Sequence, residues 1–254
     1  MTHPTTDRLP QTSPYVHIVW DWNGTLKDDV GDLLDAVNHT LAGLRAAPID
    51  LATYQAKHTV PIRGLYDRLL NRPLTDGEWA QAQADFAVFL RSRAPRLRPG
   101  AEQLLHQAVE LGHSQSLLSL YPHDVLVEET DRLAITGHFS RIDGRRGRDG
   151  TKAGVLADHL AALPDALRSR PVLVIGDSVD DARAAHAVGA RAVLHSGGLD
   201  SAHTLRRAGL TFTPTLEAAL ALGLRQCTSP PRLRHTPLAD PAPAPGPPPP
   251  RRRN

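Results

Sequence analysis

The sequence predicts an α/β protein in which a parallel β-sheet is flanked by helices and interrupted by an inserted, entirely helical segment. Two short apolar runs, 16–20 and 172–175, are typical of parallel strands that are buried on both faces. From residue 99 onward, strand-like and helix-like segments alternate, which predicts helices on both faces of the sheet. Residues 28–95 show helical spacing only and predict the helical insertion.

The first apolar run, Val16–Trp20, ends at Asp21. Ligands of open α/β sheets bind at the carboxyl ends of the strands, so Asp21 stands where a reactive carboxylate is expected. Gly24, three residues later, allows a sharp turn or a close approach to a ligand. Asp, Asn and Gly are also ordinary turn residues, so this segment alone leaves a plain exit from the strand open.

The second run, Val172–Ile175, leads into Gly176 and Asp177, and Asp181 follows at the start of an expected helix. Two parallel strands then deliver carboxylates to the same edge of the sheet. Close carboxylates repel each other, so such a site binds a cation or shares a proton. Oxygen ligands of this kind suit Mg²⁺. The alternative is that Asp177 and Asp181 only cap the helix that follows.

Apolar residues within 28–95 recur at spacings of three and four, as on amphipathic helices. Thr75 and Glu78 form a capping-box signature at the start of the longest of these helices. Helices are expected near 33–44, 51–57, 62–70 and 76–93. Beyond residue 99, helices are expected near 101–111, 123–133, 152–164, 181–188 and 216–224, and further strands at 117–118 and 192–194.

Four motifs follow one another in a fixed order along the chain. They are Asp21-Trp22-Asn23-Gly24-Thr25, a hydroxyl at the end of an apolar strand (Ser119), a lysine near a helix start (Lys152), and Gly176-Asp177 with Asp181. In this set and order the chain resembles the haloacid dehalogenase-like superfamily, in its phosphoglycolate phosphatase-like branch. One motif alone would be weak, but four in order are specific. The resemblance implies a Rossmann-like core with a helical cap inserted over the site.

This resemblance and the composition together predict the domain organisation. Residues 15–27 and 96–226 are expected to form the α/β core and residues 28–95 the cap. Residues 1–14 and 227–254 are expected to be disordered. The second of these is a Pro/Arg-rich tail without the apolar content that a packed core needs. It carries five arginines and one aspartate, so the rest of the chain has a net charge of −2 despite the overall +2.

The resemblance implies a Mg²⁺-dependent phosphatase. The metal would be held by Asp21, the main-chain carbonyl of Asn23, and Asp177. Asp181 would support it through water or by fixing Lys152. Mg²⁺ would reduce the repulsion between an anionic nucleophile and an anionic phosphate ester.

The resemblance also implies that Asp21 is the nucleophile and forms an aspartyl-phosphate, which splits one difficult step into two. The Ser119 hydroxyl and the Lys152 ammonium would bind phosphoryl oxygens and stabilise the charge of the transition state. In the expected cap, Arg63 is the candidate substrate contact, because it follows Pro61 and Ile62 at a helix start. Taken singly, Ser119 could end a strand and Lys152 could be a solvated helix residue.

Asn23 departs from the family pattern, which has an aspartate here as general acid and base. An amide cannot serve in either role. The loss of general acid–base help costs ~10²–10⁴-fold in rate. We therefore expect a slow phosphatase in which hydrolysis of the aspartyl-phosphate suffers most. The metal site is less affected, because it needs only the backbone carbonyl of this residue.

Three alternatives stay open at this point. A haloacid dehalogenase needs no Mg²⁺ and lacks the paired acids, so Asp177 and Asp181 argue against it. A phosphonatase-like C–P hydrolase also lacks the second aspartate of the first motif and takes a Schiff-base lysine from its cap, where Lys57 is the candidate. A phosphate-binding regulatory protein that has lost turnover is compatible with Asn23.

Composition sets the remaining expectations. The single cysteine, Cys227, excludes an intrachain disulfide and agrees with a reducing cytoplasm. Residues 1–14 have no apolar stretch of the kind found in signal peptides, and no run of 18 apolar residues predicts a membrane span. The expected partner is a small phosphorylated metabolite, with no membrane and no nucleic acid, and the expected state is a monomer or homodimer.

Overall fold

In the computed structural model, residues 15–59, 62–147 and 150–228 are described. The predictions of disorder for residues 1–14 and for the tail from 229 onward lie outside the described residues. The helix α11 (Leu216–Thr228) runs past the predicted start of the tail at residue 227. Cys227 on this helix packs into the main apolar core, which accounts for the later end.

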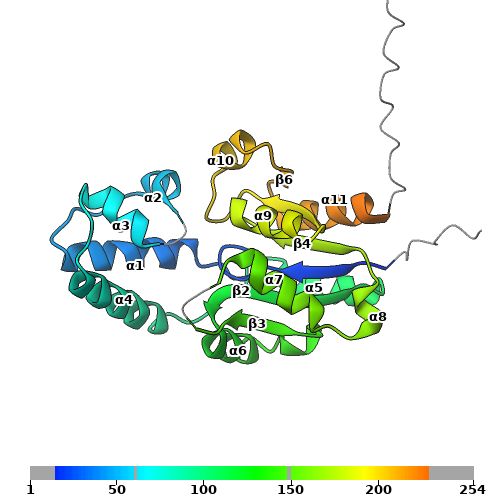
Figure 1. The fold of residues 1–254 in the computed structure, drawn as a ribbon. Helices are drawn as coiled ribbons and strands as arrows, with labels where there is room; N and C mark the ends of the chain where they lie inside the picture. The colour runs from blue at the N-terminus through cyan, green and yellow to red at the C-terminus, as the bar shows by residue number, and fades with distance from the viewer. Residues whose placement is uncertain (1–14, 60–61, 148–149, 229–254) are drawn as a thin grey trace, which may run out of the picture.

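The core of the protein is a six-stranded parallel sheet with the order β3-β2-β1-β4-β5-β6 (Figure 1). The predicted Rossmann-like α/β fold is therefore confirmed. The order reverses between the neighbours β1 and β4, which is where open α/β sheets bind their ligands. The strands are β1 His17–Trp20, β2 Ser114–Pro122, β3 Ile142–Arg145, β4 Val172–Gly176, β5 Arg191–His195 and β6 Phe212–Thr213.

Both faces of the central strand β1 are buried, because its residues alternate between two apolar clusters. Ile18 and Trp20 pack with residues of α5, α6 and α11, whereas Val19 packs with residues of α7 and α9. Helices on both faces explain why the three residues after His17 in this strand are all apolar. Besides α11, the core helices are α5 Ala101–Glu110, α6 His123–Arg132, the 3₁₀ turn Thr136–His138, α7 Lys152–Ala161, α8 Asp165–Arg168, α9 Val179–Ala187 and α10 Ala202–Arg207.

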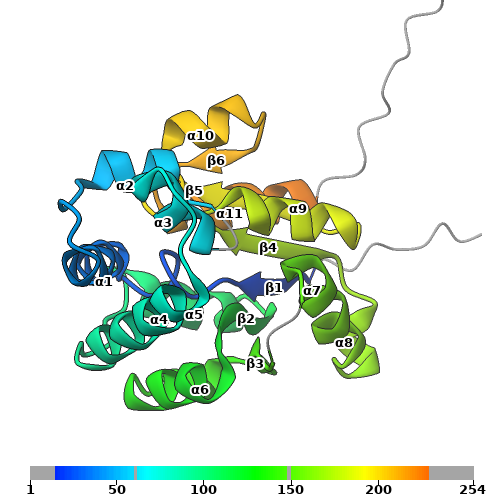
Figure 2. The same ribbon diagram turned by 60° about the vertical axis from the view of Figure 1, so that its left-hand side comes forward.

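A helical cap lies beyond the carboxyl ends of the strands (Figures 1 and 2). It has an apolar core of its own, to which Leu33, Val37 and Leu41 contribute as the helical spacing predicts. The predicted capping box between Thr75 and Glu78 is present. The cap helices are α1 Val30–Gly43, α2 Leu51–Lys57, α3 Arg63–Leu70 and α4 Asp76–Arg91.

The structure adds elements that the sequence patterns do not predict. The edge strands β3 and β6 and the short helices α8 and α10 have no counterpart among the predicted elements, and β2 is longer than the predicted 117–118. The strand β3 reads Ile-Asp-Gly-Arg, which has no apolar alternation. An edge strand pairs with one neighbour only, so its sequence is less constrained by burial.

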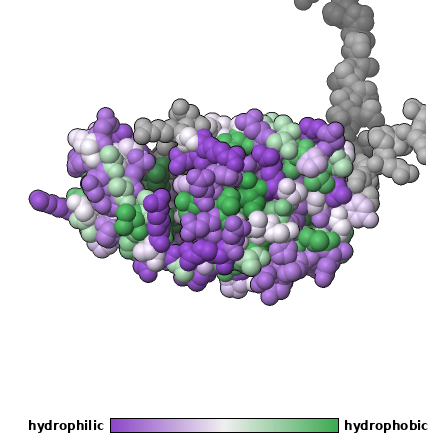
Figure 3. All heavy atoms as spheres, turned by 90° about the horizontal axis from the view of Figure 1, so that it is seen from below, coloured by the Kyte–Doolittle hydropathy of each residue, from purple (hydrophilic) through white to green (hydrophobic). Residues whose placement is uncertain are grey.

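Hydrophilic residues cover much of the face shown in Figure 3, with apolar residues in small groups among them. Within the described part of the chain, the helices are too short or too polar to cross a bilayer.

Candidate active site

Asp21 and Asp177 lie at the point where the strand order reverses. The register pairs Trp20 of β1 with Ile175 of β4, and the Asp21 N–H donates to the Ile175 carbonyl over 2.9 Å. Each aspartate directly follows the last residue of its strand. Both side chains are buried, with 6% of Asp21 and 1% of Asp177 exposed. The sheet therefore places two carboxylates at its carboxyl edge, as the sequence predicts.

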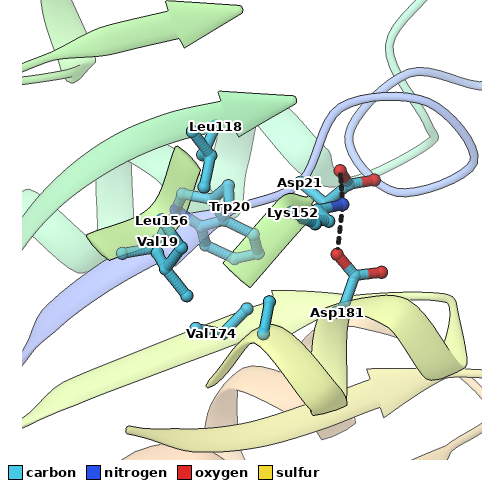
Figure 4. Close-up of a pocket in the computed structure, with 9 residues that line it drawn as sticks. Val19, Trp20, Asp21, Leu118, Lys152, Leu156, Val174 and Asp181 are labelled. Carbon is cyan, nitrogen blue, oxygen red and sulfur yellow. Dashed lines mark hydrogen bonds and ion pairs between the residues drawn. The ribbon is translucent and has the colours of Figure 1, made fainter. Parts of the chain in front are cut away.

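Lys152 reaches these carboxylates from the first residue of α7. The Thr151 hydroxyl accepts a hydrogen bond from the Gly154 N–H and fixes the start of this helix. The ammonium of Lys152 lies 2.5 Å from Asp21 Oδ1 and forms an ion pair with Asp181 (Figure 4). It thus bridges the first and the fourth motif.

The carboxylate of Asp177 is tightly enclosed. Its Oδ2 accepts the Leu199 N–H over 2.5 Å, and its Oδ1 accepts the Thr25 hydroxyl over 3.0 Å. A Cβ atom at Gly198 or at Gly24 would overlap with Asp177 Oδ2. Gly24 also has a φ of +73°, which suits glycine. Both glycines are therefore needed for this carboxylate to sit where it does.

Asp181 is held by the start of α9. Its Oδ2 accepts hydrogen bonds from the backbone and hydroxyl of Ser178, and Ser178 in return accepts from the Asp181 N–H in a capping box. Asp181 therefore does cap the helix with Oδ2, as the alternative expects. It also forms an ion pair with Lys152 through Oδ1, which the alternative does not include. A Cβ at Gly176 would overlap with the Asp181 carboxyl group, so this glycine makes room for it.

Asn23 and Ser119 are brought together although 96 positions separate them. The Ser119 hydroxyl donates to Asn23 Oδ1 at 3.5 Å, a weak hydrogen bond, and accepts the Tyr121 N–H over 3.1 Å. The other end of the Asn23 amide donates to Asp29 Oδ2 over 2.6 Å. Asp29 was not among the predicted site residues. It is an ordinary acidic residue beside a helix start, and the sequence gives no signal that its side chain turns back to the first motif.

Burial and crowding shift the pKa values of the site. Burial raises the pKa of Asp21 to about 7, with a contribution from Asp181 and against the effect of Lys152. Burial and the neighbouring Asp21 and Asp181 raise the pKa of Asp177 well above its usual value. Burial also acts to raise the pKa of Asp181, but Lys152 and the Ser178 hydrogen bonds outweigh it and lower that pKa. The pKa of Lys152 is raised, because Asp181 and Asp21 outweigh its desolvation.

The donor set fits a cation. One carboxylate oxygen each from Asp21, Asp177 and Asp181 lies within 4.8 Å of the other two. Three carboxylates and the single ammonium of Lys152 leave an excess of two negative charges in a buried site. Burying such an excess is costly unless a cation or protons neutralise it. The residues present therefore match a divalent metal with oxygen ligands.

A family model described as haloacid dehalogenase-like hydrolase matches residues 15–189. The chain belongs to this family of hydrolases. The match covers the first, second, third and fourth motifs as the sequence predicts them. A search of curated proteins gave no match.

Solved structures show the same fold. A haloacid dehalogenase-like family hydrolase from Streptococcus pneumoniae superposes with a TM-score of 0.70 at 18% identity, covering 83% of this chain and 99% of the other. A predicted phosphatase from Clostridium acetobutylicum gives a TM-score of 0.68 at 17% identity, covering 80% and 95%. A predicted phosphoglycolate phosphatase from Haemophilus somnus gives 0.64 at 18% identity, covering 83% and 98%. At 17–18% identity, these superpositions show a shared fold and do not establish a shared substrate.

The two candidate residues of the cap, Arg63 and Lys57, contact other residues of the cap. The Arg63 guanidinium donates to the Leu74 carbonyl over 2.6 Å and to Asp76 over 3.1 Å. It therefore holds the loop between α3 and α4. The Lys57 ammonium donates to the Arg68 carbonyl over 3.4 Å. These contacts engage both side chains within the cap.

Two further residues, missed by the sequence patterns, fix the loop that carries the first motif. Arg98 donates to the carbonyls of Gly24 and Thr25 over 2.9 and 3.0 Å. His195 Nε2 donates to the same Gly24 carbonyl over 2.8 Å, while its Nδ1 accepts the Gly197 N–H. These contacts set the tautomer of His195, whose pKa burial lowers to about 4. Arg98 and His195 lie far apart in sequence and match no local motif.

The cap touches the core close to Asp177. The Gln55 amide on α2 donates to the Gly198 carbonyl over 3.0 Å, and Leu199 packs against the apolar core of the cap. Tyr54, next to Gln55, is 2% exposed. Burial raises the pKa of its phenol, and the negative charges of Asp29 and Asp177 add to this effect. Through these contacts, helix α2 approaches Asp177.

Proposed function

We propose that this hydrolase is a phosphatase that cleaves a small phosphomonoester through an aspartyl-phosphate on Asp21. The observation that carries the proposal is the contact of Lys152 with both Asp21 and Asp181 beside the buried carboxylate of Asp177. A carboxylate nucleophile, a fixed ammonium and a cation-binding cluster are the groups that transfer of a phosphoryl group requires.

In the first step an oxygen of Asp21 attacks phosphorus, the bond from phosphorus to the ester oxygen breaks, and the leaving oxygen takes a proton from solvent. In the second step a water oxygen attacks the same phosphorus and gives a proton to solvent. The bond from phosphorus to the Asp21 oxygen then breaks, which releases phosphate and restores the carboxylate. Ser119 and Lys152 donate hydrogen bonds to the phosphoryl oxygens and stabilise their charge in both transition states. The ion pair with Asp181 keeps the ammonium of Lys152 charged and in place for this role.

Asp21, Asp177 and the backbone carbonyl of Asn23 would hold Mg²⁺, with Asp181 in support. When bound, the metal supplies positive charge that reduces repulsion between Asp21 and an anionic ester. The buried excess of negative charge in this cluster supports the assignment. Hard oxygen donors of this kind suit Mg²⁺.

Asn23 makes the proposed enzyme slow, because its amide neither donates a proton to the leaving oxygen nor takes one from water. General acid–base help is worth ~10²–10⁴-fold, so esters of weakly acidic alcohols should be hydrolysed most slowly. Small phosphomonoesters such as phosphoglycolate, sugar phosphates and nucleotides are the candidate substrates. The intracap contact of Lys57 gives no support to a C–P hydrolase with a Schiff-base lysine.

The function is tested by hydrolysis of an aryl phosphate with a good leaving group, with and without Mg²⁺. We expect turnover that needs Mg²⁺ and that Asp21→Asn abolishes. Asp158→Asn, an exposed position on α7, is the matched control and should leave the rate unchanged. Full activity of Asp21→Asn would exclude the proposed nucleophile. Tight binding of phosphate by calorimetry without any product would instead indicate a regulatory binding protein.

A further inference from the structure

The side-chain amide of Asn23 is held at both ends. Its Nδ2 lies 2.6 Å from Asp29 Oδ2, and its Oδ1 lies 3.5 Å from the Ser119 hydroxyl. A carboxylate can only accept hydrogen bonds, so the end of the amide that faces Asp29 must be the nitrogen. The carbonyl oxygen of Asn23 is therefore the end that faces Ser119.

Burial, a hydrogen bond and an ion pair hold the Asp29 carboxylate in this position. It is 1% exposed, and its Oδ1 accepts the Gly24 N–H over 2.8 Å. The Lys27 ammonium lies 3.7 Å from Oδ2, and that ammonium is itself fixed by Glu129 over 2.8 Å. Although Asp29 stands at the N-terminal cap of α1, its side chain accepts no hydrogen bond from that helix. Its carboxylate thus serves the loop of the first motif and not the helix.

We propose that Asp29 is a positioning residue that fixes Asn23 with its carbonyl oxygen toward Ser119, so that the side chain at position 23 presents a hydrogen-bond acceptor on this side and no donor. This inference rests on the proposed phosphatase function, in which Ser119 contacts the phosphoryl group. The acceptor can orient the O–H of an attacking water or alcohol. It gives no help to a departing alkoxide, which needs a proton.

This pairing changes what a substitution at position 23 should do. In Asn23→Asp, two carboxyl groups would face each other at hydrogen-bonding distance, so they would repel unless they share a proton. A proton held between positions 23 and 29 is not available to a leaving group.

Combining Asn23→Asp with Asp29→Asn exchanges the amide and the carboxylate between the two positions. The oxygen of the amide introduced at position 29 then accepts the Gly24 N–H, and its nitrogen donates to the carboxylate introduced at position 23. The second oxygen of that carboxylate faces Ser119. The exchanged pair therefore restores the hydrogen bond that either single substitution disturbs.

Thermal unfolding of the metal-free full-length chain measures the pairing without any assay of activity. The wild type, both single variants and the exchanged double variant form a double-mutant cycle. We expect Asn23→Asp to lower Tm and the exchange to recover most of the loss. Asp158→Asn, at an exposed position on α7, is the matched control and should leave Tm unchanged. Additive changes in Tm would overturn the proposal.

Hydrolysis of an aryl phosphate and of an alkyl phosphate in the presence of Mg²⁺ tests the orientation of the side chain at position 23. The exchanged variant should hydrolyse the alkyl phosphate ~10²–10⁴-fold faster than the wild type, with little gain for the aryl phosphate. Asn23→Asp alone should show no such gain, a split that a purely structural role of Asp29 would not produce. An equal gain in Asn23→Asp and in the exchanged variant would overturn the proposal. If no variant turns over either substrate while the Tm changes stay non-additive, the pairing is supported and the phosphatase function is contradicted.

Discussion

The Nζ atom of Lys152 lies 2.5 Å from the Oδ1 atom of Asp21, although 131 positions separate the two residues. The same ammonium pairs with Asp181. The buried ammonium of Lys152 at the start of α7 thus links the end of β1 with the start of α9. The contact that would serve chemistry also neutralises charge within the folded core.

We predict that Lys152→Met lowers both stability and activity. Removing one partner of a buried ion pair leaves uncompensated charge and costs about 3–5 kcal/mol in the free energy of unfolding. Loss of a donor that stabilises transition-state charge costs ~10²–10³-fold in kcat. Urea unfolding and aryl phosphatase assays check the two effects. Unchanged stability in Lys152→Met would show that the three carboxylates are neutralised without this ammonium.

The stabilisation by Mg²⁺ should increase with pH. The folded protein holds a proton on Asp21 up to about pH 7, the value of its raised pKa, whereas the usual pKa of the group is 3.8. Between these values the folded state binds more protons than the unfolded state, so the stability of the metal-free protein falls as pH rises. A cation must displace that proton, and its affinity should rise about tenfold per pH unit for each proton released.

Thermal unfolding with and without Mg²⁺ at about pH 5 and about pH 8 tests this dependence. The Mg²⁺-induced rise in Tm should be larger at the higher pH and should disappear in Asp177→Asn. Asp158→Asn should behave as the wild type. A rise of the same size at both pH values would show that proton and metal do not compete.

Gly198→Ala should damage the site, because its Cβ would overlap with Asp177 Oδ2. The carboxylate must move away from the Thr25 hydroxyl or the loop must shift. We expect loss of the Mg²⁺-induced rise in Tm and a large loss of aryl phosphatase activity. Gly77→Ala is the matched control: nothing lies near its Cβ position on α4, and alanine there should stabilise by up to about 1 kcal/mol. Normal Mg²⁺ binding by Gly198→Ala would contradict the described geometry.

A buried polar chain crosses the sheet below the site. Ser116 Oγ lies 2.8 Å from Nε2 of both His17 and His159, and His159 Nδ1 lies 2.8 Å from Asp143 Oδ2. His17 lies between two hydroxyls, because its Nδ1 is 2.9 Å from Ser114 Oγ. Two hydroxyls suit a neutral imidazole with one donor and one acceptor nitrogen. Burial, His159 and Arg170 lower the pKa of His17 to about 4.

This lowered pKa predicts a loss of stability in acid. Between about pH 6.5 and about pH 4 the unfolded state binds more protons at His17 than the folded state, so the free energy of unfolding falls as pH falls, by up to about 3 kcal/mol. His17→Gln removes this contribution and should give a shallower decline. Urea unfolding at several pH values in this window checks the difference. Parallel curves for the wild type and His17→Gln would show that His17 is protonated alike in both states.

Local sequence patterns sufficed for the central strands, the four cap helices and the capping box at Thr75. Each of these features depends on residues that are neighbours in the chain or one helical turn apart. The edge strands β3 and β6 escaped prediction because an edge position accepts polar residues. The helix α11 ends later than predicted because Cys227 packs into a core that only the folded chain provides.

The sequence by itself determined the fold class, the family, and the order of motifs that carries Asp21, Ser119, Lys152 and Asp177. Only the tertiary structure decided that Asp29 holds the Asn23 amide and that Arg63 is engaged within the cap. The physical reason is that a periodic pattern reports which face of an element is buried. The partner of a polar side chain depends instead on where the folded chain places donors and acceptors, and no local pattern records that.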